Sequence, residues 1–139
     1  MNSNALTGLK VPAPTPNEIS RPFWEATGRG KLQLQQCDDC ERWIFYPRAH
    51  CPFCWGAKLA WRDVSGLGTL KSHCIVNRPG HPSWQNLAPY PLGLVELAEG
   101  PTMLSTLVDI ELSDLRVGLP LRVKHVQVGD FVLPMFTGA

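Results

Sequence analysis

Two pairs of cysteines place the strongest constraint on how this chain can fold. Cys37 and Cys40 form one CxxC pair, and Cys51 and Cys54 form a second pair after ten intervening residues. Each pair follows a strand-like run, which predicts a knuckle that holds two thiolates side by side. Zinc takes four such ligands at about 2.3 Å, and four thiolates leave no position open for water. The spacing therefore predicts one structural zinc ion per chain.

Other uses of these cysteines are open at this stage. Disulfides or buried free thiols would fit the count, and iron in the same thiolate setting is an alternative to zinc. The sequence has no basic segment followed by an apolar one of the kind that directs secretion, so we expect a reducing, cytoplasmic location. Disulfides are rare in such a compartment, which favours the metal.

The segments around and after the cysteines are mainly β. Period-two alternation and β-prone residues predict short strands at 31–36, 42–47 and 59–64. Five further strands follow, with a short helical turn over 111–118 after the third of them, and this order is typical of an OB-type barrel. The strands expected in the barrel cover 69–77, 92–98, 102–110, 120–128 and 131–136.

The chain divides into three parts. Residues 1–19 are polar and rich in proline, which predicts a flexible arm. Residues 20–64 hold a short helix, with Ser20 as its N-cap and Pro22 in its first turn, followed by the zinc ribbon. Residues 65–139 form the OB-fold domain. The expected fold class is therefore mainly β, with one N-terminal helix, a zinc ribbon and a five-stranded barrel.

Composition argues against two classes of protein. No run of eighteen apolar residues is present, so we expect no membrane span. The net charge is +1, and residues 63–139 hold five basic side chains against seven acidic ones, which disfavours binding to nucleic acid. Charged residues make up 18% of the chain, against about a quarter in typical domains. Either a compact β domain or a surface covered by another subunit accounts for this low charge.

No arrangement of side chains predicts catalysis by this chain. The fifth cysteine, Cys74, lies beside His73 in an expected strand, where adjacent side chains point to opposite faces. We therefore interpret Cys74 as a small apolar residue of the barrel core rather than a nucleophile. His125 lies among charged residues of a strand and is expected to face solvent. No Ser/His/Asp set, phosphate-binding loop or dinucleotide fingerprint is present.

The order of helix, ribbon and barrel resembles a known family, the acyl-CoA-associated OB-fold proteins with an N-terminal rubredoxin-like zinc ribbon. The resemblance covers roughly residues 20–138, and Glu41 departs from it because a Gly usually follows the second ligand. The matching residues are Pro22-Phe23-Trp24-Glu25, Gly30, Cys37, Cys40, Phe45-Tyr46-Pro47-Arg48, Cys51-Pro52-Phe53-Cys54, Trp61, Ser65-Gly66-Leu67-Gly68-Thr69, Pro89-Tyr90, Glu96, Gly100, Gly118, Pro134 and Phe136.

The resemblance implies an accessory subunit of a thiolase-like or lipid-transfer-protein-like enzyme. Members of the family help to hold acyl-CoA or its acyl chain and complete its tunnel. Their complexes form or break carbon–carbon bonds by thiolase, acetyltransferase or retro-aldol chemistry, and the catalytic groups generally belong to the partner. A nucleic-acid-binding module and an independent enzyme that uses Cys74 remain as alternatives.

A subunit of this kind needs side chains that contact the substrate or the partner. Large aromatic residues anchor such contacts when they lie at the surface. Arginine suits phosphates and carboxylates, and the proline-rich loop 78–91 is long enough to carry a binding function. The predicted contact residues are Phe23, Trp24, Tyr46, Arg48, Arg78, His81, Trp84 and Tyr90.

Overall fold

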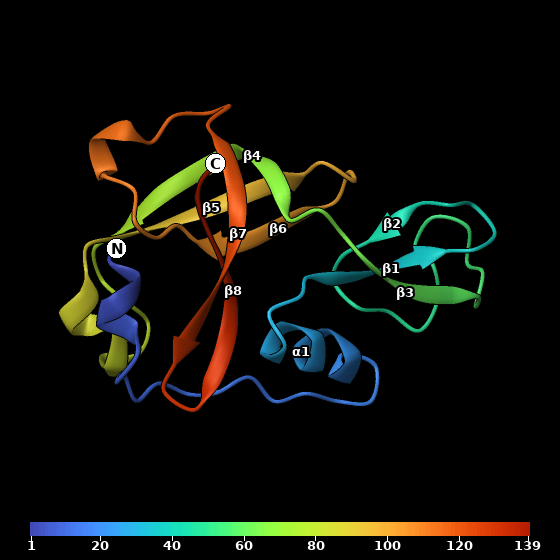
Figure 1. Ribbon diagram of the computed structural model, residues 1–139, viewed down its shortest axis with the longest axis horizontal. Coiled ribbons are helices and arrows are strands. Elements are labelled where there is room, and N and C mark those ends of the chain that lie inside the picture. The colour runs from blue at the N-terminus through green and yellow to red at the C-terminus, as the bar shows by residue number, and fades with distance from the viewer.

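The chain forms two antiparallel β-sheets that lie at opposite ends of an elongated molecule. The computed structural model describes all 139 residues. A three-stranded sheet carries the cysteines, a five-stranded sheet curls into a barrel, and one helix lies near the junction of the two (Figure 1). The mainly β class, with its single N-terminal helix, ribbon and barrel, is confirmed. No helix is long and apolar enough to cross a membrane.

Helix α1 (Arg21–Gly28) packs one face on the body of the protein. Pro22 lies in its first turn, where its fixed φ suits the helix and its missing N–H costs nothing. The Ser20 hydroxyl does not cap the helix but accepts a hydrogen bond from the backbone N–H of Asn17 at 3.1 Å. Gly30 follows with a φ of 75°, a conformation that ends a helix readily. The buried face of α1 carries Phe23, Ala26 and Thr27.

The ribbon sheet has three short strands. Strands β1 (Gln33–Cys37), β2 (Trp43–Ile44) and β3 (Leu59–Asp63) follow in chain order, and β1 lies in the centre of the sheet. Leu34 on β1 belongs to the main apolar cluster, whereas Cys37 and Ile44 form a small separate cluster with Cys51. The ribbon is thus thin, with little apolar core of its own.

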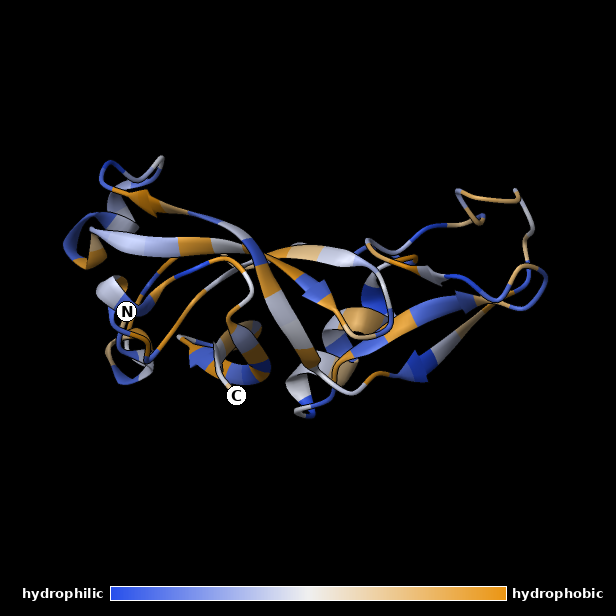
Figure 2. Cartoon of the chain, turned by 90° about the horizontal axis from the view of Figure 1, so that it is seen from above, coloured by the Kyte–Doolittle hydropathy of each residue, from blue (hydrophilic) through white to orange (hydrophobic).

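The barrel has the strand order of an OB fold. Its strands are β4 (Leu67–Val76), β5 (Tyr90–Leu97), β6 (Thr102–Thr106), β7 (Pro120–Val128) and β8 (Phe131–Gly138), in the order β6-β5-β4-β7-β8. The sheet nearly closes between β6 and β8, where Leu107 and Phe136 form a single parallel bridge. Hydrophobic and hydrophilic residues alternate along the barrel strands (Figure 2), as expected for strands with one face inside.

One apolar cluster joins the two modules. Phe23 of α1 and Leu34 of the ribbon pack with Leu70, Val95 and Phe136 of the barrel. Gly93 of β5 lies within this cluster, and a Cβ there would meet the Leu70 Cδ1 at 2.8 Å. The barrel interior is therefore filled by side chains rather than hollow.

The N-terminal segment differs from the flexible arm that its composition predicts. A 3₁₀ turn, η1 (Ser3–Leu6), places Leu6 at 0% exposure beside Val126 and Val128 in a second apolar cluster. The Ser3 backbone N–H and hydroxyl donate to the two carboxylate oxygens of Asp109 at 2.9 and 2.8 Å. The sequence prediction missed this docking because the few apolar residues of the segment show no regular period, and the barrel end supplies the buried partners of Leu6.

Two further short 3₁₀ turns complete the structure. The turn η3 (Leu112–Asp114) lies where a helical link was predicted between the third and fourth barrel strands. The turn η2 (Pro82–Leu87) lies in the long loop, which packs Trp84 and Leu87 on the second apolar cluster. This loop is thus part of the closure of the barrel end.

Cys74 and His125 do not lie where the strand pattern predicted. Beyond a bulge between Leu70 and Ser72, β4 pairs with β5 alone, because its pairing with β7 ends at Thr69. The outer half of β4 therefore extends past the core, and Cys74 is exposed. His125 is half-buried, and its Nε2 atom has no hydrogen-bond partner. Burial lowers the pKa of His125, although the nearby carbonyl of Lys31 acts in the opposite direction.

Candidate metal centre and apolar groove

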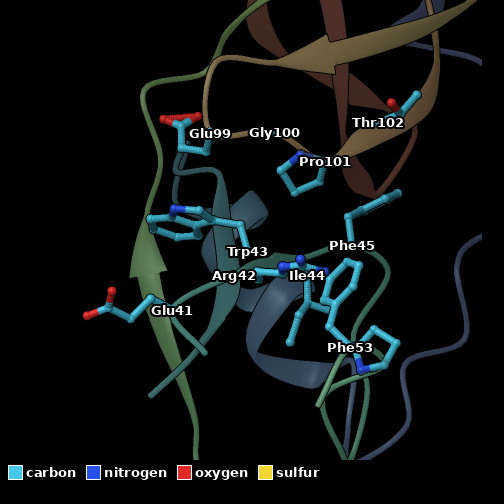
Figure 3. A pocket seen from close by; sticks show the side chains of 11 residues that line it. Glu41, Arg42, Trp43, Ile44, Phe45, Phe53, Glu99, Gly100, Pro101 and Thr102 are labelled. Atoms are coloured by element: carbon cyan, nitrogen blue, oxygen red, sulfur yellow. The ribbon is translucent and has the colours of Figure 1, made fainter. Parts of the chain in front are cut away.

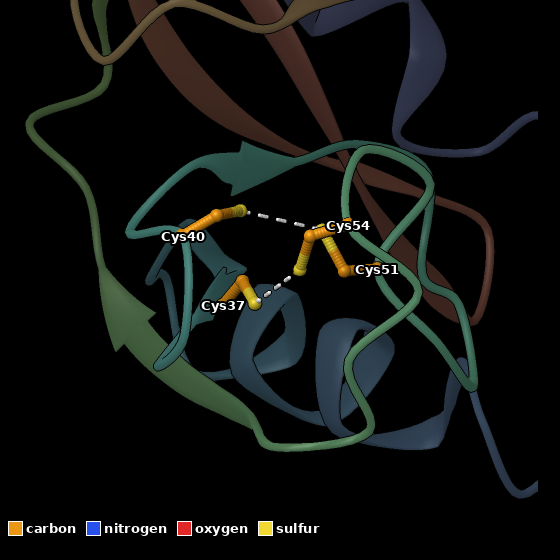
Figure 4. A group of neighbouring side chains, drawn as sticks. All are labelled: Cys37, Cys40, Cys51 and Cys54. Carbon is orange, nitrogen blue, oxygen red and sulfur yellow. Dashed lines mark hydrogen bonds between the residues drawn. The ribbon is translucent and has the colours of Figure 1, made fainter.

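The four cysteines of the CxxC pairs converge on one point. Their sulfur atoms all lie within 4.8 Å of one another, with 3.6 Å between Cys37 and Cys54 and 3.6 Å between Cys40 and Cys51. Four sulfurs at zinc-binding distance in a tetrahedron stand about 3.8 Å apart, so the arrangement fits the ion. The gaps are far longer than a disulfide bond of about 2.05 Å. Figure 4 shows the two pairs facing each other across this point.

The two knuckles share one backbone geometry. The N–H of Glu41 donates to the carbonyl of Cys37 at 2.9 Å, and the N–H of Trp55 donates to the carbonyl of Cys51 at 2.9 Å. The residue after each second cysteine is left-handed, with φ of 63° at Glu41 and 65° at Trp55. This conformation favours Gly and costs other residues about 1 kcal/mol. Glu41 therefore keeps the shape of the knuckle at the expense of some strain.

Backbone N–H groups favour the thiolate form at Cys51, whereas at Cys54 the backbone N–H of Gly56 lowers the pKa but the neighbouring thiols and burial raise it to about 12. Burial raises the pKa of the Cys51 thiol, but the backbone N–H groups of Cys54 and Phe53, together with the neighbouring thiols, lower it to about 7. The N–H of Phe53 lies 3.4 Å from the Cys51 sulfur. Because a metal binds the thiolate form, these donors favour metal binding. All four positions of the tetrahedron are taken by protein sulfur, so the site is structural in its chemistry.

An uncharged groove of about 410 Å³ lies along the seam where the barrel nearly closes. Edge strands β6 and β8 form its floor, and at this seam the Ser105 hydroxyl donates to the carbonyl of Pro134 at 2.7 Å. Helix α1 and the segment after β2 supply its aromatic wall, in which the rings of Phe45 and Tyr46 lie 5.5 Å apart. The groove is lined by Phe23, Trp24, Phe45, Tyr46, Leu92, Met103, Leu104, Ser105, Thr106, Leu133, Pro134 and Met135.

A second cleft, of about 560 Å³, separates the ribbon from the turn between β5 and β6. It has a mixed lining, with the guanidinium carbon of Arg42 4.7 Å from the centre of the Phe53 ring. Figure 3 shows Glu41 and Glu99 on the far side of Trp43 from this pair. Since the lining holds one cation and two carboxylates, this cleft favours no ligand class as clearly as the uncharged groove does.

The structure brings three of the predicted contact residues together at the groove. Phe23 is buried beneath it, Trp24 is half-buried, and Tyr46 is 43% exposed. Their rings form one cluster, with the Phe23 and Trp24 centroids 4.9 Å apart and those of Phe23 and Tyr46 6.2 Å apart. Arg48 is exposed two residues beyond Tyr46 and does not line the groove.

The other predicted contact residues lie in or near the long loop. Arg78 is exposed and away from the groove, and the Nδ1 atom of His81 accepts a hydrogen bond from the N–H of Ser83 at 3.1 Å. Trp84 packs on the second apolar cluster, and its ring lies 6.0 Å from that of Tyr90. Tyr90 is buried, and burial raises the pKa of its hydroxyl. Trp84 and Tyr90 thus help to close the barrel end.

Leu104 and Leu133 line the groove but were not among the predicted contact residues. Leu104 is 61% exposed and pairs across the sheet with Leu94, which is also exposed. The sequence did contain a signal for Leu104. Met103 and Leu104 are adjacent, and because a strand places neighbours on opposite faces, one of them had to point away from the barrel interior. A strand with apolar residues on both faces indicates a second apolar contact outside the barrel.

Two family models match consecutive parts of this chain. The rubredoxin-like zinc ribbon domain of ChsH2 matches residues 24–60, and the C-terminal OB-fold domain of ChsH2 matches residues 61–126. The chain belongs to the ChsH2 family. Its division into ribbon and barrel therefore follows a two-domain pattern shared within this family, and the metal site lies in a known zinc ribbon domain.

Relatives of the chain carry names of two kinds. A DUF35 domain-containing scaffold protein of Methanothermobacter thermautotrophicus is 32% identical over 102 residues, which is 73% of this chain and 76% of that protein. A probable enoyl-CoA hydratase alpha subunit of Thermomonospora curvata is 28% identical over 129 residues, which is 92% of this chain. The chain spans only 40% of the length of that hydratase subunit.

A solved structure repeats the arrangement of both modules. A chain of the structure described as "Ltp2-ChsH2(DUF35) aldolase" superposes with a TM-score of 0.81 at 27% identity. The match covers 91% of this chain and 98% of that chain. The placement of ribbon and barrel relative to each other is therefore common to the two proteins.

Proposed function

We propose that this protein is a non-catalytic, zinc-containing subunit of an acyl-CoA enzyme complex. Its partner is a thiolase-like or lipid-transfer-protein-like enzyme that forms or breaks carbon–carbon bonds. The observation that carries this proposal is the match over 91% of the chain to one chain of an Ltp2-ChsH2 aldolase. The names of the scaffold and hydratase relatives support the same role.

The groove supports a role in holding the acyl part of the substrate. None of its twelve lining residues is charged, and nine of them are hydrophobic. An acyl chain gains free energy on such a surface, since burial of apolar area is worth about 25 cal/mol per Å². The phosphates of CoA would gain nothing there, because no cation lines the groove. We infer that the acyl group lies in the groove and the nucleotide outside it.

The same surface suits contact with the partner. Leu104, Leu94 and Tyr46 are exposed apolar side chains on or beside the groove. Exposed apolar groups that gather on one face mark an interaction site more often than scattered ones do. A partner that covers this face would turn the open groove into a closed tunnel for the acyl chain.

Affinity capture from the native lysate tests the proposal. The tagged chain should recover a thiolase-like subunit in near-equal amount, identified by mass spectrometry. The variant Leu104→Arg places a charge at the groove and should lose that partner. Val117→Arg is the matched control, because Val117 is also exposed, at 69%, but does not line this groove, so this variant should retain the partner.

Trp24→Ala provides a second measurement on the same complex. It should weaken partner binding more than it lowers the stability of the barrel, because Trp24 is half-buried at the groove rather than in the core. Recovery of the chain without any thiolase-like subunit would refute the accessory role. Recovery of nucleic acid that is lost at higher salt would support the nucleic-acid alternative instead.

A further inference from the structure

Part of the aromatic wall of the groove belongs to a segment whose backbone makes no hydrogen bonds to other backbone groups. Residues 45–50 connect β2 to the second zinc knuckle and supply Phe45 and Tyr46 to the groove. Residues 45–50 lie outside the strands, and none of them makes a backbone-to-backbone hydrogen bond. Its position must therefore be fixed by ring packing and by side chains that bond to it.

One side chain, that of Gln35, makes all the side-chain hydrogen bonds of this segment. The Arg48 backbone N–H donates to Gln35 Oε1 at 2.7 Å, and Gln35 Nε2 donates to the Arg48 carbonyl at 2.8 Å. The Gln35 side-chain amide thus pairs with both backbone groups of Arg48, as a residue of a neighbouring antiparallel strand would do. Gln35 is 5% exposed, so solvent does not compete strongly for these bonds.

The burial of Gln35 is unusual among the glutamines of β1. Gln33 is half-buried and donates to the exposed carboxylate of Asp63, and Gln36 is half-buried and donates to the Glu41 carbonyl. A buried amide is tolerated only where its hydrogen bonds are satisfied, so the Gln35 position demands the Arg48 backbone as its partner. Two residues further along β1, Cys37 is a predicted zinc ligand.

We propose that Gln35 is a positioning residue, which sets the aromatic wall of the groove by holding the backbone of Arg48. This inference rests on the proposed function, because it assumes that the groove binds an acyl group. With the clamp present, Tyr46 lies two residues from a fixed point, and its ring stays against Phe23. Without the clamp, the segment has only ring packing to hold it over the groove.

The test uses Gln35→Met, which keeps the volume of the side chain and removes both hydrogen bonds. Titration calorimetry measures the affinity of the full chain for octanoyl-CoA. Hydrogen exchange measures protection of the amides of residues 45–50. The matched control is Gln33→Met on the same strand, since the hydrogen bond of Gln33 is exposed and does not reach the groove.

In Gln35→Met we expect about tenfold weaker binding of octanoyl-CoA, the size of effect expected when one or two buried hydrogen bonds are lost. The Arg48 amide should exchange faster, while zinc content stays at one per chain and Gln33→Met behaves as wild type. If Gln35→Met does not fold, Gln35→Asn keeps the amide but is too short for both bonds, and the same losses are expected.

The outcomes separate the two proposals. If the wild type binds octanoyl-CoA and the Gln35 variants bind it equally well, with unchanged protection of residues 45–50, the positioning role is wrong. If the wild type does not bind octanoyl-CoA at all, alone or with its partner, the acyl-binding role of the groove is wrong. Faster exchange of residues 45–50 together with weaker binding supports the positioning role.

Discussion

The packing of Leu6 predicts that the first residues of the chain stabilise the barrel. Leu6 has 0% exposure and lies in a cluster with Val108, Val126, Val128 and Met135. Replacing a buried Leu by Ala typically costs 2–5 kcal/mol, with the lower values where the site can collapse. Because η1 lies near the chain terminus and can shift to fill the space, we expect a loss of about 2–3 kcal/mol for Leu6→Ala.

Urea unfolding, followed by far-ultraviolet circular dichroism and tryptophan fluorescence, measures this loss. Trp84 packs on the same cluster, so it is the one of the five tryptophans whose share of the fluorescence reports on this site. The control is Ile19→Ala in the same N-terminal segment, where the side chain is 42% exposed and the expected change is below about 0.5 kcal/mol. If Leu6→Ala changed the free energy of unfolding no more than Ile19→Ala does, the docking of the segment on the barrel would be refuted. The prediction of a flexible arm would then hold.

Four other predictions concern the ribbon and two titratable groups. Cys40→Ser should release the metal and unfold the ribbon, and full metal content by elemental analysis would contradict the four-thiolate site. Glu41→Gly should relieve the left-handed strain at φ 63° and stabilise the ribbon by about 1 kcal/mol, read as stronger zinc retention against a chelator. Burial lowers the pKa of His125 in the folded state. The stability that neutral His125 contributes is therefore present above its unfolded pKa of about 6.5 and is lost as pH falls through the lower folded pKa. His125→Gln should remove this loss of stability from unfolding curves measured at decreasing pH. The hydrogen bond from Lys124 and those from Ser3 hold the pKa of Asp109 at about 2, below its ordinary 3.8, so this stability is present at neutral pH and is lost as pH falls from 3.8 towards 2. Because the carboxylate is about a third exposed, Asp109→Asn should cost only about 1 kcal/mol at pH 7, and an unchanged unfolding midpoint would refute the role of its charge.

The sequence was sufficient for the features that depend on local spacing. Two residues between cysteines define a knuckle whatever the rest of the chain does, so the metal ligands followed from Cys37 to Cys54 alone. Alternating side chains located every strand within a few residues, and Pro22 with Gly30 bounded the helix. These are short-range properties, in which each residue is constrained by neighbours along the chain.

Features that depend on which surfaces meet were decided by the tertiary structure. Cys74 was expected in the core, but pairing of β4 with β7 stops at Thr69 and leaves that part of the strand outside it. Leu6 was expected in a flexible arm, but the end of the barrel provides a pocket of apolar side chains for it. Neither outcome can be read from residues near either position, because the buried partners of Leu6 are more than a hundred residues away and the strand whose pairing decides the exposure of Cys74 is β7.

The groove also depends partly on the local sequence and partly on the tertiary structure. Its aromatic residues were predicted as contacts because rings such as Trp24 and Tyr46 do not suit a solvated surface. That they meet Leu104 and Leu133 over one seam required the closure of β6 against β8 and the packing of α1 beside it. The sequence thus determined the metal site and the strands through local spacing, whereas the groove exists only because distant segments pack together and bury apolar surface.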